Sequence, residues 1–176
     1  KALAHEFIKS GDNVIISSRN KQRVDTTVSE LNEKTKDGGG KAYGITCDVS
    51  INSQVEALAN FAVEHMGIID IWINNAGIKS SQRNLFINLN YEEMHRVINV
   101  NILGTLFGIQ QALRIMKDQA HGKIFNMEGL GSRGRAVPYE FIYGFSKNPL
   151  PYLLKSIPKE LKEANQEHIL INNLSP

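Results

Sequence analysis

Blocks of apolar residues with two different spacings follow one another along the chain. Short runs rich in Val and Ile predict buried strands, and stretches with an apolar residue at every third or fourth position predict helices. The predicted strands lie at 13–18, 41–49, within 67–77, and at 122–127 and 168–174. The predicted helices cover 2–11, begin at Asn20, begin at Ser50 or Asn52, run over 91–117, and include Tyr143. A glycine-rich stretch, 37–40, predicts a flexible loop.

The regular alternation of strands and helices is typical of βαβ units. We therefore predict an α/β fold, with a parallel sheet and helices on both of its faces, in a single domain over residues 1–176. In such sheets ligands bind outside the carboxyl ends of the strands. Polar residues follow four of the predicted strands, at 17–19, 47–49, 74–77 and 126–132. This clustering predicts a functional edge.

Composition and charge exclude only a few classes of function. The hydrophobic fraction of 41% and the charged fraction of 22% are ordinary for a globular protein. The net charge is +2, and the basic residues are scattered, so nucleic-acid binding is not suggested. The single cysteine, Cys47, excludes an internal disulfide, and the five histidines show no metal-ligand spacing. No apolar run approaches the roughly 20 residues of a membrane span.

The two ends of the sequence carry no start or stop signal. Residues 1–11 read as the middle of a helix, and the last residues follow directly on an apolar run. We therefore expect a sequence truncated at both ends, so the lack of a visible targeting segment has no weight.

Tyr143 and Lys147 are the first candidates for chemistry. They stand four positions apart, so on a helix their side chains share one face. A phenol beside an ammonium group suits proton donation, although a surface tyrosine and a solvated lysine would give the same spacing. The position of the pair after the predicted strand 122–127 favours the catalytic interpretation.

Several runs together resemble the short-chain dehydrogenase/reductase family. The runs are "NNAG" (74–77), "NILG" (101–104), "YGFSK" (143–147) and "LSP" (174–176), in the order and spacing of that family. Other runs are most similar to its chlorophyll(ide) b reductase branch: 1–19, 69–77, 124–132 and 171–176. The resemblance covers essentially the whole chain. It implies a Rossmann-type doubly wound sheet whose first strand and glycine-rich phosphate loop are missing from this sequence.

The resemblance assigns catalytic roles to three residues. Tyr143 would protonate the substrate oxygen during hydride transfer. Lys147 would lower the pKa of that tyrosine and hold the nicotinamide ribose. Asn101 would support a water relay to the lysine, whereas from the residues alone it is a polar interruption of an apolar stripe that needs a partner.

The resemblance also implies a cofactor site. Asn74, Ala76 and Gly77 would form the turn that passes under the cofactor. Asp48 and Val49 would contact the adenine ring, although an acid at a helix N-terminus is an equal interpretation of Asp48.

The residues after the second strand of the family's sheet indicate which cofactor is bound. An acid at this place would bind the ribose of NAD, whereas an arginine accommodates the additional phosphate of NADP. Ser18 and Arg19 stand there without an acid. This predicts NADPH, with Arg19 on the phosphate and Ser18 assisting, against the alternative of an ordinary surface arginine.

The chain departs from the family at its usual serine. That serine would fall near Gly129 or Leu130, neither of which has a hydroxyl group. Ser132 would serve if the loop curls back, as a group that polarises the carbonyl. Otherwise Glu128 or a water molecule fills the role, or nothing does, and Ser132 is an ordinary loop residue.

Prolines form a further departure. Pro149, Pro151 and Pro158 stand where the family has an unbroken helix. An interior proline costs about 3 kcal/mol and kinks a helix, which puts the placement of Tyr143 and Lys147 in question.

The leading hypothesis is an NADPH-dependent reductase that converts the 7-formyl group of chlorophyll b or chlorophyllide b to a hydroxymethyl group. Two competing hypotheses are a general ketone or aldehyde reductase and a non-catalytic module that binds nucleotide. The resemblance further implies a small-molecule carbonyl substrate, a homodimer or homotetramer, and a chloroplast location in the stroma or at the thylakoid, with peripheral membrane association as an option. Without the branch resemblance, the expected location is cytoplasmic.

Overall fold

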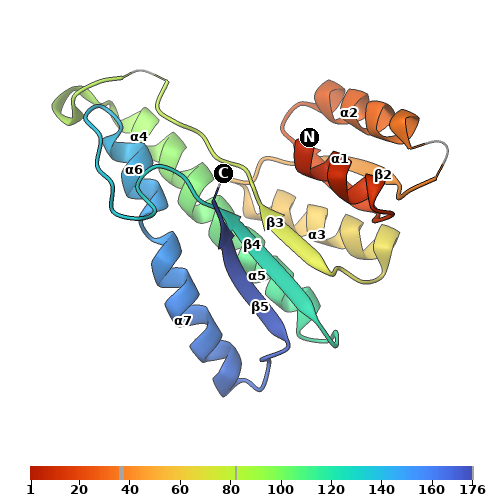
Figure 1. Cartoon of the computed structure of the whole chain (residues 1–176). Coiled ribbons are helices and arrows are strands. Elements are labelled where there is room, and N and C mark those ends of the chain that lie inside the picture. Colours follow the sequence, from red (N-terminus) through yellow and green to blue (C-terminus); the bar gives the residue numbers. More distant parts are fainter. Residues whose placement is uncertain (36–37, 82, 176) are drawn as a thin grey trace. The chain divides into compact units, whose positions relative to one another are not determined.

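The computed structural model describes residues 1–35, 38–81 and 83–175, which form two compact units (Figure 1). The first unit comprises residues 1–48 and 53–67, and the second comprises 49–52 and 68–176. Asp37 of the predicted loop and Pro176 of the terminal run lie outside the described residues. The prediction of a single domain over 1–176 stays a prediction.

The first unit contains two parallel strands and three helices. Its elements are α1 (Ala2–Lys9), β1 (Val14–Ser18), α2 (Lys21–Lys34), β2 (Ala42–Thr46) and α3 (Asn52–Met66). The register of β1 and β2 runs from Val14 opposite Ala42 to Ser18 opposite Thr46. A small core of Ala4, Ile8, Leu31 and Ala42 joins α1 and α2 to β2. The predicted cap is confirmed, because the side chain of Asn20 accepts a hydrogen bond from the backbone N–H of Arg23.

Helices cover both faces of this two-stranded sheet. Gly44 faces α2, and a β-carbon at that position would overlap the side chain of Val24. The next residue back, Tyr43, faces α3, where its ring lies 5.2 Å from the ring of His65. Successive residues of a strand point to opposite faces, so α2 and α3 lie on opposite sides.

The second unit contains three parallel strands in the order β3-β4-β5. Its elements are β3 (Ile71–Asn74), the short 3₁₀ turn η1 (Phe86–Asn88), α4 (Tyr91–Ile98), the π-helical turn η2 (Asn99–Leu103), α5 (Gly104–Met116), β4 (Gly122–Met127), α6 (Phe141–Lys147), α7 (Leu150–Glu163) and β5 (Ile169–Leu174). All five predicted strands and the parallel α/β class are confirmed. The described strands form two sheets rather than one.

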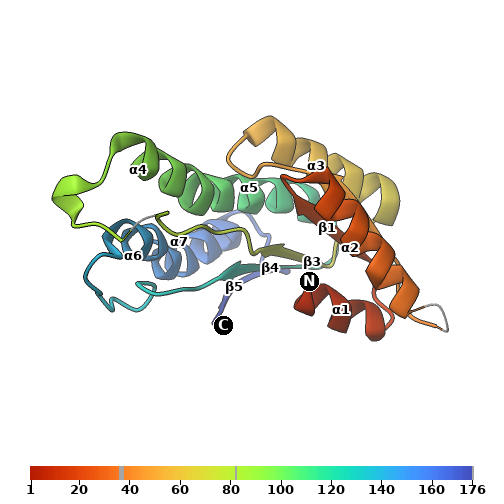
Figure 2. The ribbon, with the colours of Figure 1, turned by 90° about the horizontal axis from the view of Figure 1, so that it is seen from above.

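One face of the three-stranded sheet packs against α5 and α7. Ile124 and Ile171 lie opposite each other in the register and are buried on this face. The helix α5 approaches β3 so closely that a β-carbon on Gly108 would overlap the side-chain oxygen of Asn74. Figure 2 shows α4 and α5 as one continuous helical rod, with the π-helical turn between them.

The prolines do not disrupt a helix at the place where the sequence suggested it. Helix α6 ends at Lys147, and α7 begins at Leu150, with Pro149 as its N-cap and Pro151 in its first turn. The first backbone N–H groups of a helix have no partner within the helix, so proline is tolerated there. The expected unbroken helix is therefore replaced by two helices, and only Pro158 lies inside one.

Candidate active site

Tyr143 and Lys147 face the same point at the carboxyl edge of the three-stranded sheet. A β-carbon on Gly129 would overlap the phenol oxygen of Tyr143 and would lie 3.5 Å from Cγ of Lys147. Gly129 follows β4 by two residues, so the pair lies directly beside the end of that strand. The predicted juxtaposition of the two side chains is thus present in the structure.

Lys147 is buried and its ammonium group is fixed. Its side chain is 4% exposed, and Nζ donates a hydrogen bond of 2.9 Å to the carbonyl of Met127, the last residue of β4. Nζ also lies 3.5 Å from the point where a β-carbon on Gly77 would stand. The ammonium group therefore lies between the end of β4, to which it is bonded, and the turn that follows β3.

The pKa directions differ from the one that the sequence suggested. Burial, and then the negative charge of Glu140, raise the pKa of Tyr143 above its usual value. Burial lowers the pKa of Lys147. The expected lowering of the tyrosine pKa by Lys147 is not seen, because burial of the phenol and the charge of Glu140 both raise that pKa.

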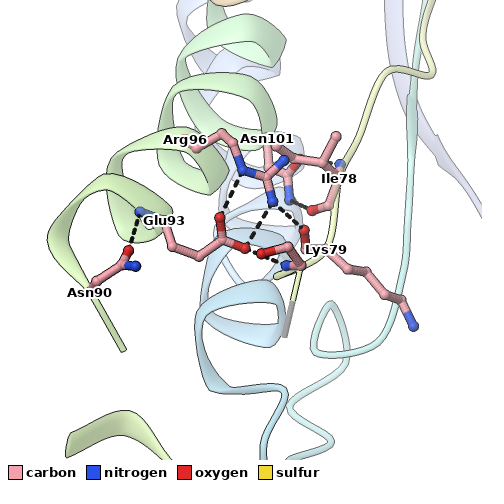
Figure 3. A network of polar contacts seen from close by, with 7 residues as sticks. Ile78, Lys79, Asn90, Glu93, Arg96 and Asn101 are labelled. Atoms are coloured by element: carbon pink, nitrogen blue, oxygen red, sulfur yellow. Dashed lines mark hydrogen bonds and ion pairs between the residues drawn. The ribbon is translucent and has the colours of Figure 1, made fainter. Parts of the chain in front are cut away.

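Asn101 holds the turn after β3. Its side-chain oxygen accepts a hydrogen bond from the backbone N–H of Ile78, and its Nδ2 donates to the carbonyl of the same residue, both at 2.8 Å (Figure 3). Nδ2 also lies 2.8 Å from Oγ of Ser146, whose hydroxyl donates to the carbonyl of Tyr143 at 2.7 Å. The polar interruption of the apolar stripe therefore has its partners, and they link the β3 turn to the helix of Tyr143.

The π-helical turn explains how Asn101 reaches this position. The turn spans Asn99–Leu103 and places Asn101, which is 1% exposed, toward Ile78. π-Helical turns inside α-helices are frequent at functional sites because they redirect one side chain.

Gly77 lies in the turn beside both polar groups. The point where its β-carbon would stand is 3.6 Å from the side-chain oxygen of Asn101, as well as 3.5 Å from Nζ of Lys147. Ala76 is exposed in the same turn. The structure therefore brings Ala76 and Gly77 to the edge where Tyr143 and Lys147 lie.

Asn74 belongs to a ladder of side-chain amides across the three strands. Its Nδ2 donates to the side-chain oxygen of Asn126 at 2.9 Å, and its own oxygen accepts from Nε1 of Trp72. Asn126 is fully buried and continues the ladder to Asn173 at 3.4 Å. Asn173 in turn donates to the carboxylate of Glu128 at 3.4 Å. The amide ladder thus runs from Trp72 to the residue after β4.

The loop after β4 curls back as the sequence analysis required for Ser132. Oγ of Ser132 accepts a hydrogen bond of 3.0 Å from the backbone N–H of Gly129, and the serine is 3% exposed. Gly131 has a φ of +102° and packs so tightly on α6 that a β-carbon there would overlap the backbone of Gly144. The glycines of this loop are therefore needed for its approach to the helix of Tyr143.

Ser132 and Glu128 were the two side chains considered for the role of the missing serine. Ser132 is the one that is bonded to Gly129. The carboxylate of Glu128 lies 3.3 Å from the guanidinium of Arg133 and accepts from Asn173. Glu128 is therefore engaged in anchoring the loop and the amide ladder.

The adenine and phosphate candidates lie mostly in the first unit. Ser18 ends β1, and its hydroxyl lies 3.2 Å from the carbonyl and 3.3 Å from the N–H of Asn20. Arg19 is exposed between β1 and α2. The backbone N–H of Asp48 donates a hydrogen bond of 2.7 Å to the side chain of Gln54. The preceding residue, Cys47, is buried, and this burial raises the pKa of its thiol to about 11. Val49 belongs to the second unit, where it packs against Gly104 at the start of α5.

A polar clamp that no sequence pattern predicted fixes the segment after the β3 turn. Arg96 donates to the carbonyl of Lys79 at 2.9 Å and pairs with the carboxylate of Glu93 at 2.8 Å, as Figure 3 shows. Glu93 also accepts a hydrogen bond from the backbone N–H of Ser81. The hydrogen bond from Arg96 is the main reason that the pKa of Glu93 is lowered to about 2.

Ser146, Lys79 and Glu140 were missed as well. Nζ of Lys79 lies 5.2 Å from the centre of the Tyr143 ring, and the charge of Glu140 acts on the same phenol. Ser146 stands inside the run "YGFSK", so its place beside the lysine was a signal in the sequence. Lys79 lies 64 positions before Tyr143, and no local pattern connects them.

The fold is that of dehydrogenases of the Rossmann type. The family model for short chain dehydrogenase matches residues 1–176. The chain therefore belongs to the short-chain dehydrogenase family.

Curated relatives and a solved structure are similar over nearly the whole chain. The chlorophyll(ide) b reductase NOL, chloroplastic, of Oryza sativa subsp. japonica is 40% identical over 99% of this chain and 51% of its own length. The protein of the same name from Arabidopsis thaliana is 37% identical over 99% of this chain and 50% of its own. The structure of ElxO with NADP bound has a TM-score of 0.86 and 29% identity, and it covers 99% of this chain and 66% of that one. The chain thus spans about half the length of the curated relatives it matches.

The described part of the chain holds no candidate metal site and no candidate membrane span. Over residues 1–35, 38–81 and 83–175, no group of three or more His, Cys, Asp and Glu side chains is arranged to hold a metal ion. No helix of these same ranges is long and apolar enough to cross a membrane.

Proposed function

We propose that this chain is the nucleotide-binding part of an NADPH-dependent reductase that converts the 7-formyl group of chlorophyll b or chlorophyllide b to a hydroxymethyl group. The observation that carries the proposal is the position of Tyr143 and Lys147, which flank Gly129 beside the end of β4. The relatives named chlorophyll(ide) b reductase support the substrate.

Tyr143 is the proton donor of the proposed reaction. Its raised pKa keeps the phenol protonated at neutral pH, which is the state that a donor to a carbonyl oxygen requires. The hydride would come from the nicotinamide of the bound cofactor. Because Gly129 has no side chain, the phenol oxygen is free to approach the space beside the strand end.

Lys147 and Asn101 position the groups around this phenol. Lys147 would bind the nicotinamide ribose, and its bond to the carbonyl of Met127 fixes the ammonium group near Gly77. Asn101 keeps the β3 turn beside α6 through Ile78 and Ser146. Ser132 would take the place of the missing serine, and the hydrogen bond from Gly129 to its hydroxyl supports this.

The residues present suit a nicotinamide cofactor. The turn of Asn74, Ala76 and Gly77 would pass under it, and Gly77 leaves the space beside Lys147 Nζ open. Asp48 and Val49 would contact the adenine ring. The family neighbour ElxO binds NADP, which agrees with this class of cofactor.

The preference for NADPH rests on Arg19 and Ser18. Arg19 is exposed directly after β1 and would pair with the ribose phosphate, a bond that a guanidinium group forms well. The dissociation constants of NADPH and NADH with Arg19→Gln test this directly. We expect NADPH binding to weaken about tenfold or more and NADH binding to stay within about twofold.

The location and the assembly follow from the same relatives. Both relatives are chloroplastic by name, so we propose a plastid location, in the stroma or at the thylakoid surface. A homodimer or homotetramer is the expected assembly. Size-exclusion chromatography with light scattering on the full-length protein measures the assembly.

The substrate is tested with the purified full-length protein. NADPH and chlorophyllide b should give a loss of the formyl absorption band, with a stoichiometric loss of NADPH absorbance. An unchanged spectrum from folded protein would refute the substrate, and a panel of ketones and aldehydes then identifies a general reductase. Tyr143→Phe should abolish reduction and preserve NADPH binding, whereas a protein inactive in both forms would be a binding module.

A further inference from the structure

Lys79 places a positive charge over the ring of the proposed proton donor. Its Nζ lies 5.2 Å from the centre of the Tyr143 ring, a distance at which an ammonium group and an aromatic face attract each other. The side chain is exposed. Lys147 is the other ammonium group beside Tyr143, but it is buried and bound to the carbonyl of Met127.

The backbone at Lys79 is held from both sides, which fixes the point from which this side chain extends. Arg96 binds the carbonyl of Lys79, and Asn101 binds both backbone groups of the preceding residue, Ile78. Glu93 binds the N–H of Ser81 two residues later. Figure 3 shows that the Lys79 side chain extends away from α4. The backbone carbonyl of Lys79 accepts a hydrogen bond from Arg96 of that helix.

Lys79 also differs from three arginines of the same unit. Each of these arginines has a carboxylate partner: Arg83 with Glu140, Arg96 with Glu93, and Arg133 with Glu128. Glu140, whose charge acts on Tyr143, is thereby paired with Arg83 at 3.9 Å. Within the described residues, Lys79 has the ring contact and no hydrogen bond or ion pair from its ammonium group. An exposed cation without a counter-ion, next to a reactive group, is suited to bind an anion of the substrate.

We propose that Lys79 determines specificity, and that its ammonium group binds a carboxylate of the substrate while the carbonyl group lies at Tyr143. This inference rests on the proposed function and specifies which form of the substrate is preferred. Chlorophyllide b has a free carboxylate where chlorophyll b has an ester. Lys79 therefore makes the free acid the preferred of the two substrates.

The test compares a free acid with an ester that differs only in its charge. KM and kcat for chlorophyllide b and for its methyl ester are measured with the full-length protein, as wild type and as Lys79→Gln. When a charge contact is equally strong in the ground state and in the transition state, its removal raises KM and leaves kcat unchanged. We expect the KM of the acid to rise about tenfold, with kcat and the values for the ester within about twofold. Lys79→Arg should restore the preference, and 0.5 M salt should reduce it in the wild type.

A matched control is available in the same unit. Lys123→Gln removes the same charge from an exposed position in β4 and should change neither substrate. If Lys79→Gln weakens acid and ester equally, or changes neither, the proposal is wrong.

Direct binding separates this proposal from the proposed function. Dissociation constants of the acid and the ester, measured by fluorescence in the presence of NADP, do not depend on turnover. If the wild type binds the acid more tightly than the ester, Lys79→Gln removes this preference, and the formyl band stays unchanged, then the proposed reaction is wrong and the proposed specificity holds. Equal binding of acid and ester by the wild type would overturn the specificity whatever the activity.

Discussion

The phenol oxygen of Tyr143 occupies the space into which any side chain at position 129 would have to grow. A β-carbon on Gly129 would overlap that oxygen and contact Lys147. A side chain at position 129, near where the family's serine is expected, is therefore incompatible with this position of the tyrosine. The hydroxyl of Ser132 reaches the backbone of Gly129 without entering that space.

Gly129→Ser should impair the enzyme although it introduces the family's residue type. The new β-carbon displaces the phenol of Tyr143, and a displacement of about 1 Å costs up to about 100-fold in rate. We expect kcat to fall about tenfold or more. Gly144→Ala is the matched control, because its β-carbon meets nothing nearer than 3.9 Å and a helical alanine is more stable than glycine by about 0.5–1 kcal/mol. Full activity of Gly129→Ser would contradict the assigned position of Tyr143.

Gly108→Ala should destabilise the second unit. The added methyl group overlaps the side chain of Asn74 and crowds the indole of Trp72. Overpacking of this kind costs about 1–3 kcal/mol, more than a helical alanine gains. Denaturant unfolding measures the loss, and the fluorescence of Trp72, the only tryptophan, should change because its hydrogen bond to Asn74 is disturbed. An unaltered spectrum and midpoint would mean that α5 does not approach β3 so closely.

Asn101→Ala should loosen the turn after β3. The change leaves the two backbone groups of Ile78 without their partner, whereas the hydroxyl of Ser146 keeps its bond to the carbonyl of Tyr143. Each buried polar group without a partner costs about 1–3 kcal/mol, so a total loss of about 2–6 kcal/mol is expected for the two backbone groups. Hydrogen exchange at the Ile78 amide should accelerate. Asn99→Ala removes an amide from the same π-helical turn and should have a small effect; equal effects of both would contradict the specific role of Asn101.

The stability of the Glu93 clamp should depend on acid pH. The pKa of Glu93 is about 2, below its usual value of 4.5, chiefly because of the hydrogen bond from Arg96. A lowered carboxyl pKa gives stability that is complete above 4.5 and is lost as pH falls toward about 2. Glu93→Gln should therefore flatten the decrease of unfolding free energy between pH 4.5 and 2. A decrease as steep as in the wild type would show that other carboxylates cause it.

Much of the fold could be predicted because the strands are short β-branched runs with clear ends. Val14–Ser18 and Ile169–Leu174 fall almost where the pattern put them, and Asn20 caps its helix as expected. The effect of Pro149 and Pro151 was misjudged, because their cost depends on where a helix begins, and hydrophobic spacing does not fix that residue.

For the candidate site, the sequence was informative about residue types and not about contacts. The spacing of Tyr143 and Lys147 was sufficient to place them on one helical face. The bonds of Asn101 to Ile78 and the approach of Lys79 to Tyr143 join residues distant in sequence. Such contacts arise from tertiary packing, and so does the burial that raises the pKa of Tyr143 instead of lowering it.

The amide ladder of Asn74, Asn126 and Asn173 has a consequence for assembly of the sheet. The three residues stand at the same level of β3, β4 and β5. Sliding β4 by a single residue would turn Asn126 to the opposite side and place Phe125 or Met127 level with Asn74 and Asn173. Misaligned pairings are thereby penalised during folding, and the reactive edge is built only when all three strands are aligned.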